Sequence, residues 1–161
     1  MADFAKIIIF QLNNQEYGTE INQVRSIERF QNLIELPQSP DFIKGIINLR
    51  GEIIPIIDLK KRLNIKNTEP TDQTRVLITA VNEVQVGIIV DAATDVIDID
   101  PNVIEPTPKF IGGSDQAKFI KAVAKLNDRL ILLSDFNYSL DLETLNEILD
   151  VIDDNSMGVK E

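Results

Sequence analysis

The side chains that could do chemistry in this chain are mostly carboxylates, because its 161 residues include 26 Asp and Glu but no histidine and no cysteine. Without those two residue types there is no histidine general base, no cysteine nucleophile and no thiolate metal ligand. Two carboxylates could still serve as acid and base in a hydrolase, but the sequence gives no pair of them a preferred separation. We therefore do not expect an enzyme.

One acidic segment, "DIDPN" at residues 98–102, begins like a calcium-binding loop. Such a loop needs glycine at its sixth position and glutamate at its twelfth, and these positions hold Val103 and Lys109. A glycine pair in "IGGSD", at 111–115, lacks the lysine and the spacing of a phosphate-binding loop. The sequence predicts neither a metal site nor a cofactor.

Recognition by a positioned cation is the remaining chemistry, and it is suggested by Arg50 and Gly51. These residues interrupt "FIKGIINLRGEIIPIIDLKKRL", the most apolar stretch of the chain, at 42–63. We interpret them as a hairpin tip in which Gly51 supplies a positive φ and Arg50 projects outward. An arginine held on a rigid turn beside apolar residues is typical of a protein-binding hot spot. A solvated loop arginine is the plainer alternative.

The composition is that of an ordinary globular protein, with 43% hydrophobic and 26% charged residues. No apolar run approaches the ~20 residues of a membrane-spanning helix, and the N-terminus lacks the basic region of a signal peptide. We therefore predict a cytoplasmic protein without membrane insertion. Its formal charge of −10 argues against nucleic acid as a partner. Residues 42–62 differ from the rest, with five basic residues against two acidic ones.

Short runs rich in Ile and Val, separated by turn residues, predict an all-β fold with few helices. The predicted strands are 5–12, 16–20, 24–30, 44–49, 52–57, 74–81, 84–91, 94–99, 119–126 and 129–134. A short helix is predicted from Asp58 to Leu63, with Asp58 as its N-cap, and an amphipathic C-terminal helix is predicted within 137–154.

An internal repeat organises these strands. Residues 6–18 match 75–87 at an offset of 69, and residues 42–59 match 119–136 at an offset of 77. We interpret the chain, 1–161, as one domain of two pseudo-symmetric five-stranded β-barrels of the SH3-like or OB-like type, packed together. Barrel one covers about 1–65, with the 137–154 helix against it, and barrel two covers about 70–136. Gly18 and Gly87, which the repeat aligns, are predicted to be positions where only glycine tolerates the backbone conformation or a close neighbour.

The repeat also shows what is particular to the arginine turn. Its counterpart in the second copy is Asn127-Asp128, the composition of an ordinary hairpin turn. Only the first copy therefore places an arginine there.

The arginine segment, together with "EYGTEINQVRSI" and "VGIIVDAATDVIDI", closely resembles the CheW family of bacterial chemotaxis coupling proteins. The likeness covers about residues 5–150 and is most specific from Asn48 to Gly51, with Pro55 and Asp58 downstream. It implies a non-enzymatic adaptor that joins methyl-accepting receptors to the histidine kinase CheA, in the cytoplasm at membrane-bound receptor arrays. Because the chain ends at Glu161, without room for a kinase or receiver domain, we expect the free-standing coupling protein.

The resemblance also implies which residues bind partners. Arg50 and Gly51 resemble the family's pair implicated in receptor and kinase coupling, and Val24 resembles an apolar position of the receptor-binding surface. Ala93 and Val96 are the matching positions of the second barrel, beside the groove between barrels. We expect a helix of the receptor's signalling tip to dock in that groove.

A second contact, with the kinase's own CheW-like regulatory domain, is expected at the apolar turns around Ile46 and Ile47. The chain departs from the family pattern at Ser26, where many members carry a glutamate that can pair with the motif arginine. Glu28 and Glu52 are the two candidates for that acidic partner.

A function of another class stays open beside the adaptor. A β-barrel could instead bind a metabolite and act as a small-molecule sensor. Such a module would be stabilised by its ligand, whereas an adaptor would respond only to protein partners.

Overall fold

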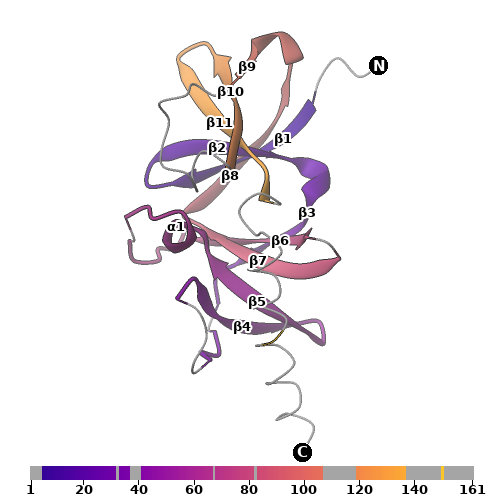
Figure 1. Ribbon diagram of the computed structural model, residues 1–161, viewed down its shortest axis with the longest axis vertical. Coiled ribbons are helices and arrows are strands. Elements are labelled where there is room, and N and C mark those ends of the chain that lie inside the picture. The colour runs from indigo at the N-terminus through magenta and orange to yellow at the C-terminus, as the bar shows by residue number, and fades with distance from the viewer. Residues whose placement is uncertain are drawn as a thin grey trace, which may run out of the picture.

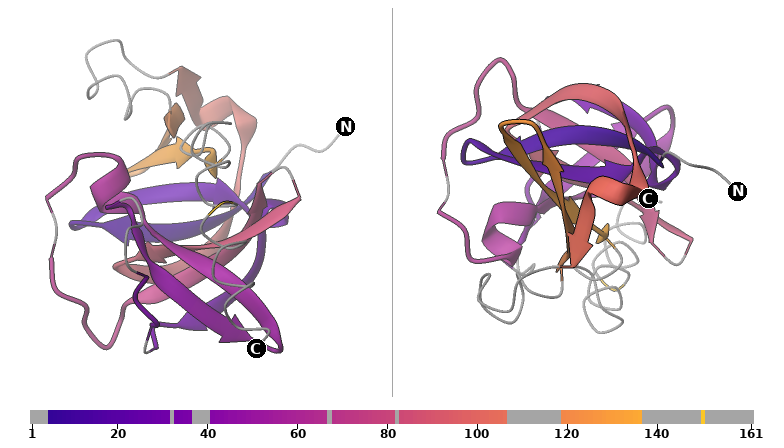
Figure 2. Two further views of the ribbon diagram at one scale, coloured as in Figure 1. Left: turned by 60° about the horizontal axis from the view of Figure 1, so that its bottom comes forward. Right: turned by 90° about the horizontal axis from the view of Figure 1, so that it is seen from above.

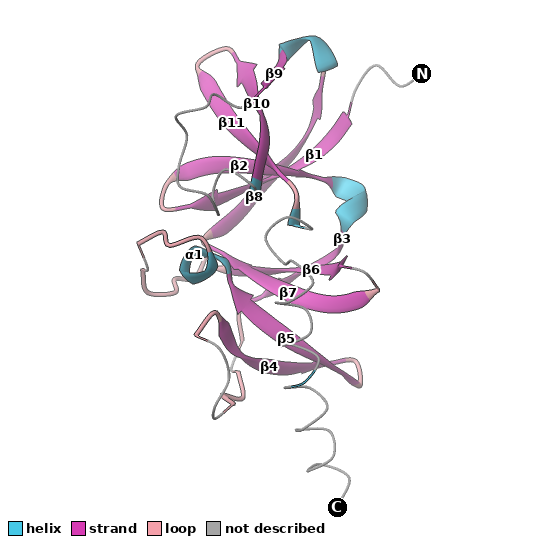
Figure 3. Cartoon of the chain, in the orientation of Figure 1, coloured by secondary structure: helices cyan, strands magenta, loops and turns pink. Residues whose placement is uncertain are grey.

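The computed structural model describes residues 5–31, 33–36, 41–66, 68–81, 83–106, 119–136 and 150, and it shows a mainly-β protein (Figure 3). Its strands are β1 (Ala5–Leu12), β2 (Gln15–Glu20), β3 (Val24–Arg29), β4 (Ile43–Leu49), β5 (Glu52–Asp58), β6 (Arg75–Val81), β7 (Val84–Val90), β8 (Ala92–Ile99), β9 (Ile104–Pro106), β10 (Ile120–Leu126) and β11 (Arg129–Ser134). The predicted all-β fold class is confirmed, and β9 is the strand that the sequence did not predict.

The strands form two sheets that make two stacked lobes (Figure 1). Lobe A contains the six-stranded sheet, in the order β8-β1-β2-β11-β10-β9, and lobe B contains the five-stranded sheet, in the order β3-β6-β7-β5-β4. Lobe B is continuous in sequence from β3 to β7, whereas lobe A combines β1 and β2 with β8 to β11. The lobes therefore do not follow the predicted barrel boundaries of 1–65 and 70–136, because the two repeats exchange their leading hairpins, β1-β2 and β6-β7.

In each lobe, the segment after one edge strand crosses to the opposite edge of the sheet. After β3, Ile34 forms a two-hydrogen-bond bridge with Ile46 of β4, with N···O distances of 3.0 and 2.9 Å. After β8, β9 pairs with β10 and sets Glu105 opposite Val123, the residue aligned with Ile46. A Cβ on Gly45 would lie 2.5 Å from the Ile34 carbonyl oxygen, so glycine at this position permits the closure in lobe B.

Buried side chains form one core between the lobes and a smaller core within each lobe. The shared core contains the rings of Phe10, Tyr17, Phe119 and Phe136, whose successive centroids lie 5.6 to 6.1 Å apart. The small core of lobe A contains Ile7, Ile9, Ile99, Ala124 and Ile131, and that of lobe B contains Ile47, Ile54, Ile56, Val76 and Ile78. Most members of the two small cores are aligned by the repeat, which is the packing reason for their similarity.

Gly18 and Gly87 occupy aligned positions on β2 and β7. A Cβ on Gly18 would lie 2.5 Å from Cγ2 of Ile7, and a Cβ on Gly87 would lie 2.7 Å from Cγ1 of Val76, which the repeat aligns with Ile7. Real Cβ atoms do not approach other heavy atoms so closely, so the predicted close neighbour is confirmed at both glycines, and in each case it is a side chain.

The helices occupy little of the described chain. The predicted short helix is α1 (Leu59–Arg62), and the Asp58 carboxylate accepts the Lys61 N–H at 3.2 Å as an N-cap. Two 3-10 turns, η1 (Ile21–Gln23) and η2 (Pro101–Val103), follow β2 and β8. The connection from α1 to β6 arcs outward from the strands (Figure 2). The predicted helix at 137–154 lies outside the described residues, apart from Asp150. Within the described part, no helix combines the length and hydrophobicity needed to cross a membrane.

Candidate protein-binding site

The arginine turn is a two-residue hairpin between β4 and β5. Arg50 has a φ of 51° and Gly51 a φ of 88°, and positive values at both central residues define the tight turns that suit the twist of a hairpin. The Gly51 N–H donates to Oδ1 of Asn48 at 3.0 Å, which fixes the turn from within. The predicted positive φ of Gly51 is confirmed, whereas that of Arg50 was not expected from its residue type.

The backbone of Arg50 is unfavourable for its residue type. The left-handed region costs a residue with a Cβ roughly 1–2 kcal/mol, and asparagine tolerates it better than arginine does. In the second repeat Asn127 occupies the aligned position with a φ of 52°. The geometry of the turn alone would favour asparagine or glycine in both repeats, so the side chain of Arg50 needs another explanation.

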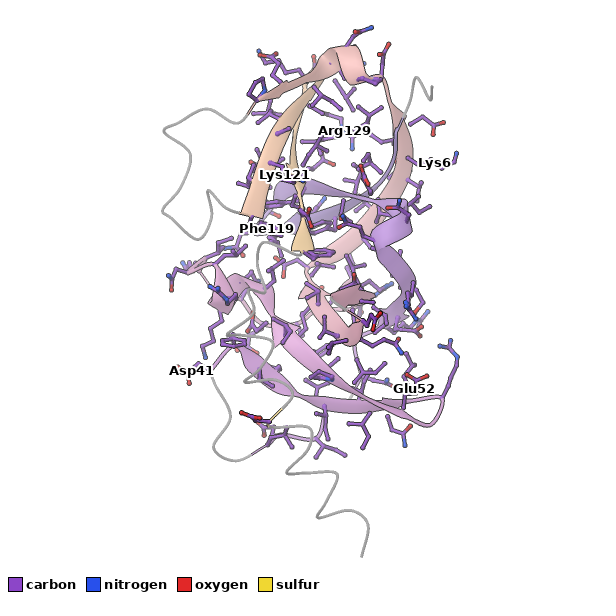
Figure 4. The ribbon with its side chains drawn as sticks, turned by 45° about the vertical axis from the view of Figure 1, so that its right-hand side comes forward. Lys6, Asp41, Glu52, Phe119, Lys121 and Arg129 are labelled. Atoms are coloured by element: carbon purple, nitrogen blue, oxygen red, sulfur yellow. The ribbon has the colours of Figure 1, made fainter. Side chains whose placement is uncertain are left out.

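Glu28 is the acidic partner of Arg50. Its Oε2 lies 3.5 Å from Nη2 of Arg50, and the two side chains are 20% and 73% exposed. Glu28 is on β3 and Arg50 follows β4, the two edge strands of lobe B, so the pair joins the hairpin tip to the opposite edge of the sheet. The other candidate, Glu52, accepts a hydrogen bond from Gln85 instead. Figure 4 shows Glu52 beside the tip of the hairpin.

The pair formed by Arg50 and Glu28 has no counterpart in lobe A. The residues aligned with them by the repeat are Asn127 and Ile97, which carry no charge. The arginine and its acidic partner are therefore a feature of one lobe only.

The residue that ends the turn also differs in charge between the lobes, because it is Glu52 in lobe B and Arg129 in lobe A. Arg129 of lobe A donates two hydrogen bonds to Glu16, at 3.0 Å from Nε and 2.8 Å from Nη2, and these bonds hold the pKa of the Glu16 carboxyl below its usual value. The aligned residues of lobe B are Glu52 and Gln85, which form a single hydrogen bond. In lobe A the arginine next to the turn is thus engaged within its own fold, whereas in lobe B the arginine in the turn is mostly exposed.

The apolar residues predicted to bind a receptor lie on β3 and β8. Val24 and Ala93 occupy aligned positions near the starts of these strands, and both are half-buried against the shared core. Val96 is 48% exposed, and Ile27, which the repeat aligns with it, is 43% exposed. Sequence reasoning did not select Ile27, although its alignment with Val96 was the signal that could have found it.

Ile46 and Ile47 are not on the surface. They are 7% and 4% exposed, and Ile47 belongs to the small core of lobe B. This burial contradicts their predicted role as apolar contacts with a kinase, because a side chain enclosed by its own fold has no area to offer a partner. The sequence pattern did not separate them from surface residues, since both faces of β4 are covered along this stretch.

These features define a class of protein. The most distinctive polar group of the described residues is an exposed arginine on a rigid turn. Two β lobes with a shared core and such a turn suit a scaffolding protein, which acts by surface contact. The CheW-like domain matches residues 6–151, and the chain belongs to the CheW family.

Individual relatives agree with this membership. The chain is 41% identical over 139 residues to the chemotaxis protein CheW of Bacillus subtilis (strain 168), covering 86% of this chain and 88% of that protein. It is 32% identical over 140 residues to the chemotaxis protein CheW of Klebsiella aerogenes, covering 87% and 84%. The crystal structure of the scaffolding protein TtCheW from Thermoanaerobacter tengcongensis aligns with a TM-score of 0.80 at 35% identity, covering 89% of this chain and 92% of that one. The predictions of a CheW-family chemotaxis adaptor and of a non-enzymatic role are confirmed by this membership.

Proposed function

We propose that this protein couples methyl-accepting chemoreceptors to the histidine kinase CheA, in the cytoplasm and beside membrane-bound receptor arrays. Its membership of the CheW family supports this role, as do relatives named as chemotaxis and scaffolding proteins. The mechanism is recognition: two surfaces of one rigid molecule bind two partners and fix their relative positions.

The observation that carries the proposal is the arginine turn. Arg50 has a backbone conformation that suits other residues better, is mostly exposed and is matched by no charged residue in the other repeat. The planar guanidinium of an exposed arginine can donate several hydrogen bonds to a partner and loses less entropy per bond than a lysine would, and arginine is common at binding hot spots. Arg50 and Gly51 are therefore our candidates for the polar part of the coupling surface.

The apolar part of the surface is formed by β3 and β8. Val24 and Ala93 lie at the edge of the shared core, and Val96 is exposed, so a helix laid across these strands would cover all three with its apolar face. We add Ile27 to this surface because it is exposed, lies on β3 with Val24 and is aligned by the repeat with Val96. The receptor's signalling helix is the proposed occupant.

The kinase contact is assigned to the tip of the β4-β5 hairpin. Ile46 and Ile47 are left out of it because they are buried, and they instead support the strand that carries the turn. A contact through one hairpin tip is small, but small interfaces suffice for transient signalling assemblies.

Reconstitution tests the proposal. Receptor signalling domains and CheA are mixed with and without this protein, and the autophosphorylation of the kinase from ATP is measured. We expect the protein to increase the receptor-dependent activity. No increase at any ratio of the three components would refute the adaptor role.

A matched pair of variants tests the surface. Val96 and Leu130 are both 48% exposed, and Leu130 lies on β11, outside the proposed surface. Val96→Glu is expected to reduce receptor binding strongly, whereas Leu130→Glu should leave it unchanged. Equal losses in the two variants would show that β8 has no special part in the contact.

A further inference from the structure

A cavity of about 230 Å³ lies in lobe A, where the end of β2, η1, β10 and β11 meet. It exists because the parallel pairing of β2 with β11 is short. Tyr17 pairs with Leu132 and Gly18 with Leu133, and the ladder then stops. Ser134 donates its hydroxyl to the Gly18 carbonyl oxygen at 3.0 Å, and beyond this bond the two strands separate.

The aligned seam of lobe B stays closed. There the parallel ladder of β5 with β7 begins at the aligned pair, Ile56 with Gly87, and continues through Ile57 with Ile88 and Asp58 with Ile89. The cavity at the corresponding place in lobe B, which Ile89 lines, has a volume of about 30 Å³. That is space for a water molecule rather than for a ligand.

The residues along the seam explain the difference between the lobes. Lobe B places Ile57, Ile88 and Ile89 along its closed seam. The aligned residues of lobe A are Ser134, Thr19 and Glu20, and all three line the cavity. Three apolar side chains in lobe B thus correspond to three polar ones in lobe A, at the point where the strands part.

The hydroxyl groups in the cavity have acceptor capacity to offer. The Thr19 hydroxyl donates to Oε1 of Gln23 at 3.2 Å, and the Ser134 hydroxyl donates to the backbone, so the hydrogen of each is used. A hydroxyl whose hydrogen is engaged presents its lone pairs as acceptors. With the Glu20 carboxylate in the same wall, this side of the cavity suits a donor with a positive charge.

Lys121 gives the cavity a positively charged group. Its Nζ lies 3.3 Å from Oδ2 of Asp135, and its side chain remains 51% exposed. Both residues line the cavity. Figure 4 shows Lys121 and Phe119 on the side of lobe A that faces the junction of the lobes. The cavity therefore has a cationic group as well as carboxylates and hydroxyl acceptors.

We propose that this cavity is a binding site for a small zwitterion of amino-acid size. The ligand's ammonium group would lie against Glu20 and the acceptors of Thr19 and Ser134, and its carboxylate would lie against Lys121. The volume supports this class, because it falls below the range of about 300–1,000 Å³ that is usual for pockets of drug-sized ligands. The inference is independent of the adaptor role, since none of these residues belongs to the proposed coupling surface.

The experiment is a titration of the full chain followed by NMR. The probes are L-serine and L-glutamine as zwitterions, ethanolamine as a cation alone and 3-hydroxypropionate as an anion alone, at matched ionic strength. We expect saturable shifts of the backbone amides of Thr19, Lys121 and Ser134 with at least one amino acid, and much weaker shifts with the two singly charged probes. Saturation by ethanolamine or 3-hydroxypropionate alone at the same concentration would overturn the proposal, as would the absence of saturation with both amino acids.

Two variants make the result specific to the cavity. Thr19→Ile with Ser134→Ile copies the closed seam of lobe B, which already packs isoleucine at both aligned positions, and it should abolish binding in a protein that remains folded. Lys121→Met should weaken binding about tenfold or more, the usual effect of losing a hydrogen bond to a charged group. Lys44→Met, at the aligned position of lobe B, is the control. Equal weakening by Lys44→Met, or binding that survives the double isoleucine variant, would show that the ligand does not occupy this cavity.

Discussion

Lys60 and Asp91 form an ion pair at the junction of the two lobes, with Nζ 2.8 Å from Oδ1 and the lysine side chain only 4% exposed. Lys60 is in α1, between β5 and β6 of lobe B, and Asp91 links β7 of lobe B to β8 of lobe A. Asn13, in the β1-β2 turn of lobe A, completes the network. Its Oδ1 accepts from Lys60 at 3.3 Å, and its N–H donates to Oδ2 of Asp91 at 2.7 Å. This network therefore fastens the lobes to each other beside the shared core.

Removal of either charge should destabilise the protein, but by different amounts. Asp91→Ala leaves a buried ammonium without its anion, and we expect a loss of about 3 kcal/mol in the free energy of unfolding. Lys60→Met should cost less, because Asp91 is partly exposed and keeps its bond from Asn13. Urea unfolding of both variants checks the order.

A matched control for this pair is the ion pair of Lys6 with Asp98, whose side chains are 62% and 59% exposed. Lys6→Met should change the stability by no more than about 0.5 kcal/mol. If Lys6→Met and Lys60→Met reduce the free energy of unfolding equally, burial does not explain why the Lys60 network stabilises the fold.

The strands could be predicted from the sequence because each depends on its own residues, but the lobes could not. Alternation and turn residues indicate where a strand lies, and the repeat shows which strands are alike. Neither the strand pattern nor the repeat indicates which of the two copies of a hairpin joins which sheet. After the exchange of β1-β2 with β6-β7, Phe10 and Phe119 pack in the shared core with residues distant in sequence, and a local strand pattern does not encode such contacts.

Gly18→Ala should destabilise lobe A although it adds only one methyl group. The new Cβ would lie 2.5 Å from Cγ2 of Ile7, and forcing a methyl group into a packed core typically costs about 1–3 kcal/mol. Combining the change with Ile7→Ala removes the clashing atom, so the double variant should be more stable than the sum of the two single losses predicts. Thermal unfolding of the three variants measures that coupling, and strict additivity would contradict the clash.

The bond between Glu16 and Arg129 predicts a specific dependence of stability on pH. Arg129 lowers the pKa of Glu16 in the folded state, so the unfolded chain takes up a proton first as the pH falls. The pair stabilises the fold above the unfolded value near 4.5, and this contribution is lost as the pH falls through the lower, folded pKa. We expect Arg129→Met to cost about 0.5–1 kcal/mol at pH 7, with the difference from the unmodified protein shrinking at acid pH.

The same substitution in a Glu16→Gln background is the control for that pH dependence. Without the carboxyl group there is nothing at position 16 to titrate, so the effect of Arg129→Met should no longer vary between neutral and acid pH. Denaturant midpoints measured across that range provide the test, and an unchanged pH profile in the Gln background would assign the effect to another acid.

In the candidate site, the arginine turn could be predicted from the sequence, but the acidic partner of Arg50 could not. Asn48 to Gly51 indicated a hairpin with an arginine at its tip, because the aligned turn supplied a comparison. The choice between Glu28 and Glu52 depends on how the edges of lobe B meet, which a strand pattern does not encode. The bridge of Ile34 with the buried Ile46 was likewise not predictable, because its pair of hydrogen bonds is made by a segment without a strand pattern.

Arg50→Asn separates the turn's structural role from its function, because it gives the first repeat the residue that the second repeat already uses. Asn127 has the same left-handed backbone, with a φ of 52° against 51°, so asparagine should fit the turn and leave the stability equal or slightly higher. The ion pair with Glu28 is lost, but a largely exposed pair contributes no more than about 1 kcal/mol.

Receptor-dependent kinase activation by the Arg50→Asn protein should nevertheless fall sharply, since the exposed guanidinium is the group assigned to coupling. Asn127→Gly, at the aligned turn of lobe A, is the matched control, because glycine tolerates the same backbone, and it should leave activation intact. Full activation by a folded Arg50→Asn protein would remove Arg50 from the coupling surface.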